Sequence, residues 1–300
     1  MTFEMKGVGP AVANALRRIL LAEVPTVAIE KVFVVNNTSV VPDEVLAHRL
    51  GLVPLAVDPR LLEYRAEGDA ANESNTLVLR LRLKCTRGND GQPKNDAVLS
   101  KHLEWLALGS QLPEESEEKL TAFAKPQSTL LPAGCAAVHP DILLAKMRPG
   151  QEIELEAHAV KGKGKTHAKW SPVGTAWYQL CPEVVTLQSV RGEDATAFIA
   201  KVHPPNWDAA HPAHPRGLQS CYAVANGELQ VRNSRGCWYC LERVRRLSGE
   251  PRWADKVQLR LVKEHYLFTI ESVGQLPPEV LFTEAVAILR EKCIRLASGL

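Results

Sequence analysis

The sequence predicts an α+β protein, and three patterns along its 300 residues lead to that class. Residues 11–24 place apolar side chains on one face of a helix, and residues 278–296 repeat this pattern over a longer stretch. Residues 77–84 and 152–159 instead alternate largely apolar with polar or charged side chains, which is the period of a half-buried strand. Helices near both ends therefore enclose a middle that contains strands.

The first predicted helix follows Pro10, because proline is tolerated in the first turn, and it ends before Pro25, which cannot continue the hydrogen-bond ladder. Residues 26–35 are rich in β-branched side chains and favour a strand. Residues 42–50 predict a second, short helix, since a proline and two acidic side chains stand where the helix dipole favours them. The last third of the chain adds two predicted strands, near 257–261 and 266–270.

The charge balance excludes a strong general attraction to nucleic acid. The chain has 36 basic and 34 acidic residues and a formal net charge of +2, whereas phosphate-binding domains usually show a clear basic excess. We therefore expect any contact with DNA to be local and secondary. No stretch approaches the roughly 20 uninterrupted apolar residues that a membrane span needs, and we expect no membrane partner.

The cysteines do not form the pattern of a disulfide framework, because seven of them are scattered through a chain of medium length. Cys237 and Cys240 form a C-x-x-C pair, and with His211 and His214 upstream a zinc site can be drawn. The order and the long spacing match no standard zinc finger, and no strand precedes the pair as in a thioredoxin-like redox motif. We favour ordinary cysteines near a helix and expect no metal or other cofactor in this chain.

No self-contained active site is predicted. Residues 162–166 read Gly-Lys-Gly-Lys-Thr and resemble the end of a phosphate-binding loop, but Ala159 stands where the pattern requires its first glycine. A basic turn that leaves a strand is the favoured interpretation. The sequence has no G-x-S-x-G nucleophile elbow and no D-x-D carboxylate cluster. We therefore expect no catalytic residue and no enzymatic activity of the chain by itself.

Three blocks of sequence stand out when they are taken together. They are VANALRRILLAEVPTVAIEKV at 12–32, DEVLAHRLGLVPL at 43–55 and HYLFTIESVGQLPPEV at 265–280. Supporting segments follow in the expected order at 58–65, 146–155 and 161–173. Over nearly its whole length, the chain resembles the alpha-like subunit family of multisubunit RNA polymerases.

The resemblance implies an alpha-subunit-like dimerisation domain, made of a sheet and two long helices, that is interrupted by an inserted, mainly β domain. Residues 1–24 and 174–300 would form the discontinuous dimerisation domain, and residues 25–173 the insert. Family members usually have a leading strand before the segment that matches Phe3 to Gly7, whereas this chain starts at Met1. That departure bears on how the first sheet edge docks.

The implied role is assembly without catalysis. The subunit would form a heterodimer with a small alpha-like subunit, and this pair would be the platform for the largest and second-largest catalytic subunits. Magnesium and zinc are expected in other subunits, and contact with DNA only through the complex.

The assignment of the chain to one branch of the family rests on a single segment. The polymerase II counterpart carries a cysteine-rich zinc loop where residues 65–75 here contain no cysteine. The resemblance therefore favours the form shared by RNA polymerases I and III, which implies rRNA, 5S rRNA and tRNA transcription in the nucleus, including the nucleolus. The alternatives are a polymerase II type subunit, or a free-standing nucleic-acid-binding protein that uses the basic segment Lys161–Lys169.

The resemblance places the partner-facing surface on the apolar sides of the first and terminal helices. Arg17 and Arg18 are candidates for outward contacts, because adjacent residues lie about 100° apart on a helix and at least one must point away from its apolar face. A solvated surface is the alternative for either arginine, and helix capping for the two acidic residues of the second helix. The expected interface residues are Val12, Leu16, Arg17, Arg18, Ile19, Leu20, Leu21, Asp43, Glu44, His48, Arg49, Leu281, Ala285, Ile288, Leu289, Cys293 and Leu296.

Overall fold

The computed structural model describes residues 1–66, 68–89, 91–114, 118–203, 221–233 and 237–299. The chain falls into two units. The first unit contains residues 1–2, 11–177 and 269–300, and the second contains residues 3–10 and 178–268. This grouping places the first and terminal helices with most of the predicted insert, so the division into 1–24 with 174–300 and 25–173 stays a prediction.

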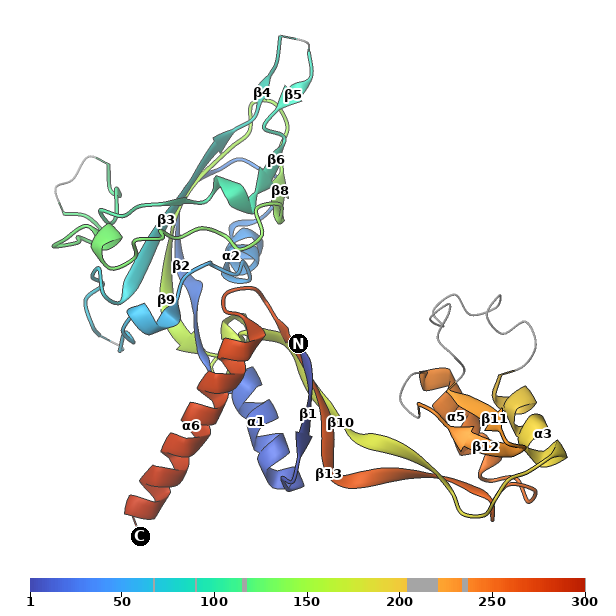
Figure 1. Ribbon diagram of the computed structural model, residues 1–300. Helices are drawn as coiled ribbons and strands as arrows, with labels where there is room; N and C mark the ends of the chain where they lie inside the picture. The colour runs from blue at the N-terminus through green and yellow to red at the C-terminus, as the bar shows by residue number, and fades with distance from the viewer. Residues whose placement is uncertain (67, 90, 115–117, 204–220, 234–236, 300) are drawn as a thin grey trace. The chain divides into compact units, whose positions relative to one another are not determined.

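An antiparallel sheet of four strands lies at the centre of the first unit (Figure 1). β3 (Thr76–Lys84) pairs with β9 (Glu152–Lys163), and both strands lie where the alternation predicted them. The register sets Leu79 opposite Ala157, so the apolar side chains of the two strands reach the same core. The sheet order is β2-β9-β3-β7, with β2 at Pro25–Asn37 and β7 at Glu104–Trp105.

The predicted short helix is α2 (Asp43–Gly51), and it packs against this sheet. Its Leu46 and Leu50 are fully buried in the cluster that also contains Ile29 and Leu79. The smaller elements of the unit are η1 (Pro59–Leu61), β4 (Thr86–Arg87), β5 (Pro93–Lys94), β6 (Ala97–Leu99), η2 (Ser100–His102), η3 (Gln127–Thr129), β8 (Leu143–Lys146) and η4 (Ala168–Trp170).

The two long helices are confirmed as α1 (Pro10–Ala22) and α6 (Pro278–Ser298). Among the described residues, no helix is long and apolar enough to cross a membrane. A separate sheet of three strands has the order β1-β13-β10. Its strands are β1 (Thr2–Lys6), β10 (Val173–Thr186) and β13 (Val257–Ser272).

The prediction of two strands near 257–261 and 266–270 was wrong, because β13 is a single strand over this range. The polar residues between the two apolar runs suggested a break. In the structure Glu264 has a φ of 56°, outside the extended region, but its carbonyl still accepts a hydrogen bond from the Gly7 amide at 2.9 Å. The strand therefore continues through a locally irregular position.

The described residues of the second unit form two helices and a hairpin, apart from its portions of β1, β10 and β13. The hairpin strands turn at Asn226 and Gly227, whose φ angles of 54° and 75° suit the two-residue turns that match strand twist. The elements are α3 (Glu193–Val202), β11 (Tyr222–Ala225), β12 (Glu228–Val231) and α5 (Trp238–Leu247).

Aromatic side chains form the core of this second unit. The Phe198 ring lies 5.7 Å from that of Tyr222 and 5.5 Å from that of Trp253, both edge-on, and all three side chains are fully buried. Edge-to-face packing is a favoured geometry for aromatic rings. A cluster of 15 buried residues, supported by a two-stranded hairpin, makes a small core.

A buried carboxylate lies inside the first unit on β9. Glu156 accepts hydrogen bonds from the Gln111 amide at 3.0 Å and from the Ser110 hydroxyl, and it contacts His158 Nε2 at 2.7 Å. Burial by itself would raise the pKa of Glu156, but these bonds outweigh burial and hold that pKa below its usual range. The carboxylate is therefore a satisfied structural group.

Replacement of Glu156 by Gln is expected to lower the free energy of unfolding by about 1–3 kcal/mol, since charged hydrogen bonds in a buried site are lost. Because the folded pKa is depressed, the wild-type contribution is present above the unfolded pKa and is lost as pH falls through the folded value. Denaturant unfolding at several pH values measures both effects. Glu104→Gln, at an exposed position on β7, is the control, and its free energy of unfolding is expected to lie within about 0.5 kcal/mol of the wild-type value. An equal loss of stability in both variants contradicts the structural role of Glu156.

Candidate functional site

The terminal helix α6 has an apolar side that only its first half buries. Leu281 and Ala285 are fully buried, whereas Ile288 and Leu289 are half-buried. The exposed fractions are 43% at Val286, just before these two residues, and 72% at Leu296, near the end of the helix, and Cys293 is also exposed. The second half of α6 therefore presents apolar side chains that the described part of the chain leaves uncovered.

The first helix differs, because its apolar side is mostly buried within the chain. Leu16, Ile19 and Leu20 are at most 4% exposed, and Leu21 is half-buried. Only Val12, near the start of the helix, is substantially exposed, at 42%. Of the apolar residues expected at the interface on α1, Val12 is thus the most accessible.

Ion pairs and hydrogen bonds hold α6 beside the end of α1, as Figure 1 shows. The Lys292 ammonium lies 2.6 Å from the carboxylate of Glu23, which directly follows α1. Gln275, just before α6, donates to the carbonyl of Val27 at 2.9 Å. Exposed ion pairs contribute about 0–1 kcal/mol each, so these contacts orient the helix more than they stabilise it.

Some of the polar side chains predicted to contact partners from α1 and α2 are hydrogen-bonded within the chain, and others are accessible. Arg17 donates to Asn14 Oδ1 at 2.9 Å, within its own helix. Arg18 is exposed, and within the described ranges it has no ion-pair partner. Asp43 accepts from the Asn37 side chain at 2.7 Å and provides no cap, since Pro42 is the capping residue. Arg18 is therefore the arginine best placed for an outward contact.

Of the remaining predicted residues on α2, Glu44 is exposed and Arg49 is used inside the chain. The Arg49 guanidinium donates to the carbonyls of Leu144, at 3.0 Å, and Leu143, which ties α2 to β8. His48 is exposed at the edge of a cavity of about 260 Å³. The outward role predicted for these residues stays a prediction, and Arg49 already has a structural role.

The glycine-rich basic segment is a turn that leaves β9, as the sequence predicted. A Cβ on Gly162 would lie 2.4 Å from the Trp170 ring, and one on Gly164 would lie 2.3 Å from the Leu21 carbonyl. The Lys165 amide donates to the Ala22 carbonyl at 2.8 Å. These glycines allow close packing against α1 and η4, and at least this amide is engaged within the chain instead of facing a phosphate.

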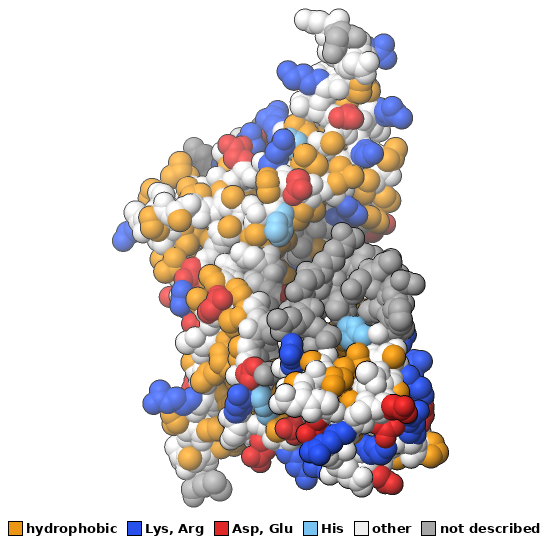
Figure 2. Space-filling model, turned by 45° about the vertical axis from the view of Figure 1, so that its right-hand side comes forward, with side chains coloured by type: hydrophobic (Ala, Val, Ile, Leu, Met, Phe, Trp, Pro, Cys, Tyr) orange, Lys and Arg blue, Asp and Glu red, His pale blue; other side chains and the backbone are white. Residues whose placement is uncertain are grey.

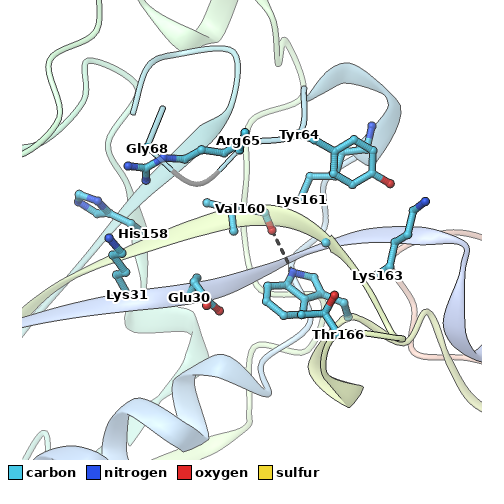
Figure 3. Close-up of a pocket in the computed structure, with 13 residues that line it drawn as sticks. Glu30, Lys31, Tyr64, Arg65, Gly68, His158, Val160, Lys161, Lys163 and Thr166 are labelled. Atoms are coloured by element: carbon cyan, nitrogen blue, oxygen red, sulfur yellow. Dashed lines mark hydrogen bonds between the residues drawn. The ribbon is translucent and has the colours of Figure 1, made fainter. Parts of the chain in front are cut away.

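A cavity of about 830 Å³ lies beside this segment (Figure 3). Lys161 donates to the Leu62 carbonyl at 2.8 Å and lies 4.8 Å from the Tyr64 ring centroid. Burial lowers the pKa of Lys161. Lys169 likewise donates to the Ile29 carbonyl at 2.9 Å. Two of the basic side chains of Lys161–Lys169 are therefore engaged by the chain itself.

The described residues on the face seen in Figure 2 show no broad basic area. Basic and acidic side chains are interspersed over the view in Figure 2. This distribution agrees with the formal net charge of +2. It favours contacts with proteins over a general electrostatic attraction to nucleic acid.

One group of residues in the second unit has metal-ligating chemistry, namely His203, Cys221 and Cys240. The sequence pointed to Cys237 and Cys240 but paired them with His211 and His214, which lie outside the described residues. His203 was missed, because 34 positions separate it from Cys237 and no short motif joins them. The prediction of a chain without metal stays a prediction.

Comparison with known proteins places this geometry in a family. The model of the RNA polymerase Rpb3/Rpb11 dimerisation domain matches residues 2–293. The chain is 42% identical over 305 residues to the human protein named DNA-directed RNA polymerases I and III subunit RPAC1, with 98% of this chain and 80% of that protein covered.

Two further relatives are similar over comparable lengths. The Saccharomyces cerevisiae protein with the same name is 40% identical, with 97% of this chain and 81% of that protein covered. The Dictyostelium discoideum DNA-directed RNA polymerase II subunit rpb3 is 31% identical, with 94% of this chain and 85% of that protein covered. The chain therefore belongs to the RNA polymerase Rpb3/Rpb11 dimerisation domain family.

Proposed function

We propose that the chain is a non-catalytic assembly subunit shared by DNA-directed RNA polymerases I and III. The observation that carries this proposal is the 42% identity over 98% of the chain to a relative named as a subunit of those two polymerases. The polymerase II relative matches at 31%, which favours the first branch. The cysteine-free segment 65–75 supports the same choice.

The exposed second half of α6 suits a role in dimerisation. Val286, Cys293 and Leu296 leave apolar surface on one side of a helix, and a second helix with its own apolar stripe would cover it. Burial of a side chain such as Leu296 stabilises a complex by about 1.5–3 kcal/mol. The partner is a small alpha-like subunit, whose equivalent helices lie against α6 and the start of α1.

The heterodimer in turn is the platform for the largest and second-largest polymerase subunits. Arg18 and Glu44 are exposed on different helices and provide polar contacts of opposite charge for these subunits. Catalysis and its magnesium belong to other subunits, and DNA is contacted only through the complex. The protein accordingly acts in rRNA, 5S rRNA and tRNA transcription, in the nucleus including the nucleolus.

Affinity capture of the tagged chain from its own cells, followed by mass spectrometry, tests the assembly role. We expect a small alpha-like protein and the two large subunits of polymerases I and III. Recovery of polymerase II subunits alone contradicts the branch, and recovery of no polymerase subunit contradicts the function.

Substitutions on α6 test the dimerisation surface. Val286→Glu and Leu296→Glu are each expected to weaken binding of the small alpha-like subunit about 10- to 100-fold, since each removes about 1.5–3 kcal/mol of apolar burial. Ala287→Glu is the matched control, because Ala287 is exposed and lies about 180° around the helix from Leu296. Calorimetric titration gives Kd for each variant; equal weakening by the control places the interface elsewhere.

The chain by itself is expected to bind duplex DNA only weakly. A nucleic-acid-binding protein that used all of Lys161–Lys169 would lose affinity with salt at a log-log slope of about 0.9 per phosphate contacted. Lys161 and Lys169 already contact backbone carbonyls, which leaves fewer cations for such contacts. Fluorescence anisotropy with labelled DNA at several salt concentrations measures the slope. The rival nucleic-acid-binding function is supported if binding is tight, its salt dependence is steep, and Lys163→Gln and Lys165→Gln reduce that slope.

A further inference from the structure

Four side chains with soft or borderline metal-ligand atoms converge in the second unit. Three segments of the chain supply them. His203 follows the end of α3, Cys221 directly precedes β11, and Cys237 and Cys240 lie at the start of α5. Residues far apart in the sequence are thus brought together by the packing of two helices on a hairpin.

The ligand atoms lie at distances that suit a single ion. Cys240 Sγ is 3.0 Å from His203 Nε2, and the ligand atoms of His203, Cys221 and Cys240 all lie within 4.8 Å of one another. A tetrahedral zinc ion with bonds of about 2.0–2.3 Å holds nitrogen and sulfur ligands about 3.5–3.8 Å apart. The observed separations bracket that value, so small side-chain movements would complete the geometry.

Cys237 is the fourth candidate ligand, and its sulfur lies outside the set of three ligand atoms that are all within 4.8 Å of one another. It is the N-cap of α5, and its sulfur accepts a hydrogen bond from the Cys240 amide at 3.4 Å. A C-x-x-C pair at a helix start brings both sulfurs to the same end of the helix.

Ordinary core cysteines do not account for this arrangement. Cys221, Cys237 and Cys240 are all buried and none is in a disulfide. Two thiols and an imidazole have ligand atoms within 4.8 Å of one another, and a third thiol accepts a hydrogen bond from the Cys240 amide. This places polar, ionisable groups together where apolar side chains would pack without such cost. A bound cation would offset that cost by holding the thiols as thiolates.

We propose that His203, Cys221, Cys237 and Cys240 bind one zinc ion that stabilises the second unit. The ligand set of three cysteines and one histidine is a common structural zinc set and leaves no open position for catalysis. An iron–sulfur cluster of the usual kind needs four cysteines, and the described group has three.

The zinc ion would act as a cross-link within a small core. The hairpin β11–β12 has two strands, and such a hairpin is only marginally stable without further support. The ion would tie Cys221, which directly precedes the hairpin, to the end of α3 and the start of α5. Both helices contribute to the aromatic core through Phe198 and Leu241, so the metal and the core would hold the same elements.

Metal analysis of the purified full chain, expressed with zinc available, tests the site. We expect one zinc ion per chain in the wild type, and loss of most of it in Cys221→Ser and Cys240→Ser. Cys181→Ser is the matched control, because Cys181 is a buried cysteine of β10 that is not among the proposed ligands. It is expected to retain the ion.

Cobalt titration of the metal-depleted wild type keeps the test independent of how the variants fold. Binding at the proposed site is expected to give the visible absorption of a tetrahedral cobalt thiolate, and zinc is expected to displace it. A chelator is expected to lower the Tm of the wild type but not of Cys240→Ser. A wild-type protein that contains no zinc and gives no cobalt thiolate spectrum overturns the proposal. Iron with inorganic sulfide in place of zinc also overturns it. Loss of zinc from Cys181→Ser overturns the choice of ligands.

Discussion

The antiparallel pairing of β2 with β9 is the constraint on which the first unit depends. It joins residues 25–37 to residues 152–163. The two ends of the long segment between these strands are therefore held side by side. The pairing also places the turn after β9 against the end of α1, where the Lys165 amide bonds the Ala22 carbonyl. Two glycines of that turn leave no room for a side chain. The position of α1 is therefore set by the sheet, and α6 is set in turn by its contact with Glu23.

Helices and strands could be predicted from the sequence where apolar residues recur with the period of a helix or of a strand. The alternation in β3 and β9 and the apolar faces of α1 and α6 are such patterns, and the structure confirms them. Burial of an isolated polar residue could not be predicted. Gln127 is an example, because it is fully buried and donates to the carbonyl of Thr76 at 2.9 Å. Such burial depends on a partner about fifty residues away.

The candidate interface shows the same limit. Leu16 and Leu296 both fit an apolar helical stripe, but the first is 4% exposed and the second 72%. The stripe predicts that a residue will be covered, and only the fold decides whether its own chain or a partner covers it. Arg49 is a second example, because it lies exposed on a helix and also bonds two carbonyls of β8, which the sequence did not predict.

Assembly and metal binding place independent demands on the chain. The helices proposed to bind the small subunit belong to the first unit, while His203 and the three thiols belong to the second. The contacts that orient α6 involve Glu23 and Val27 and no cysteine. Loss of the ion would therefore loosen the small aromatic core without removing any contact that positions the dimerisation helices. Metal binding and dimerisation are thus proposed to depend on different residues of the chain.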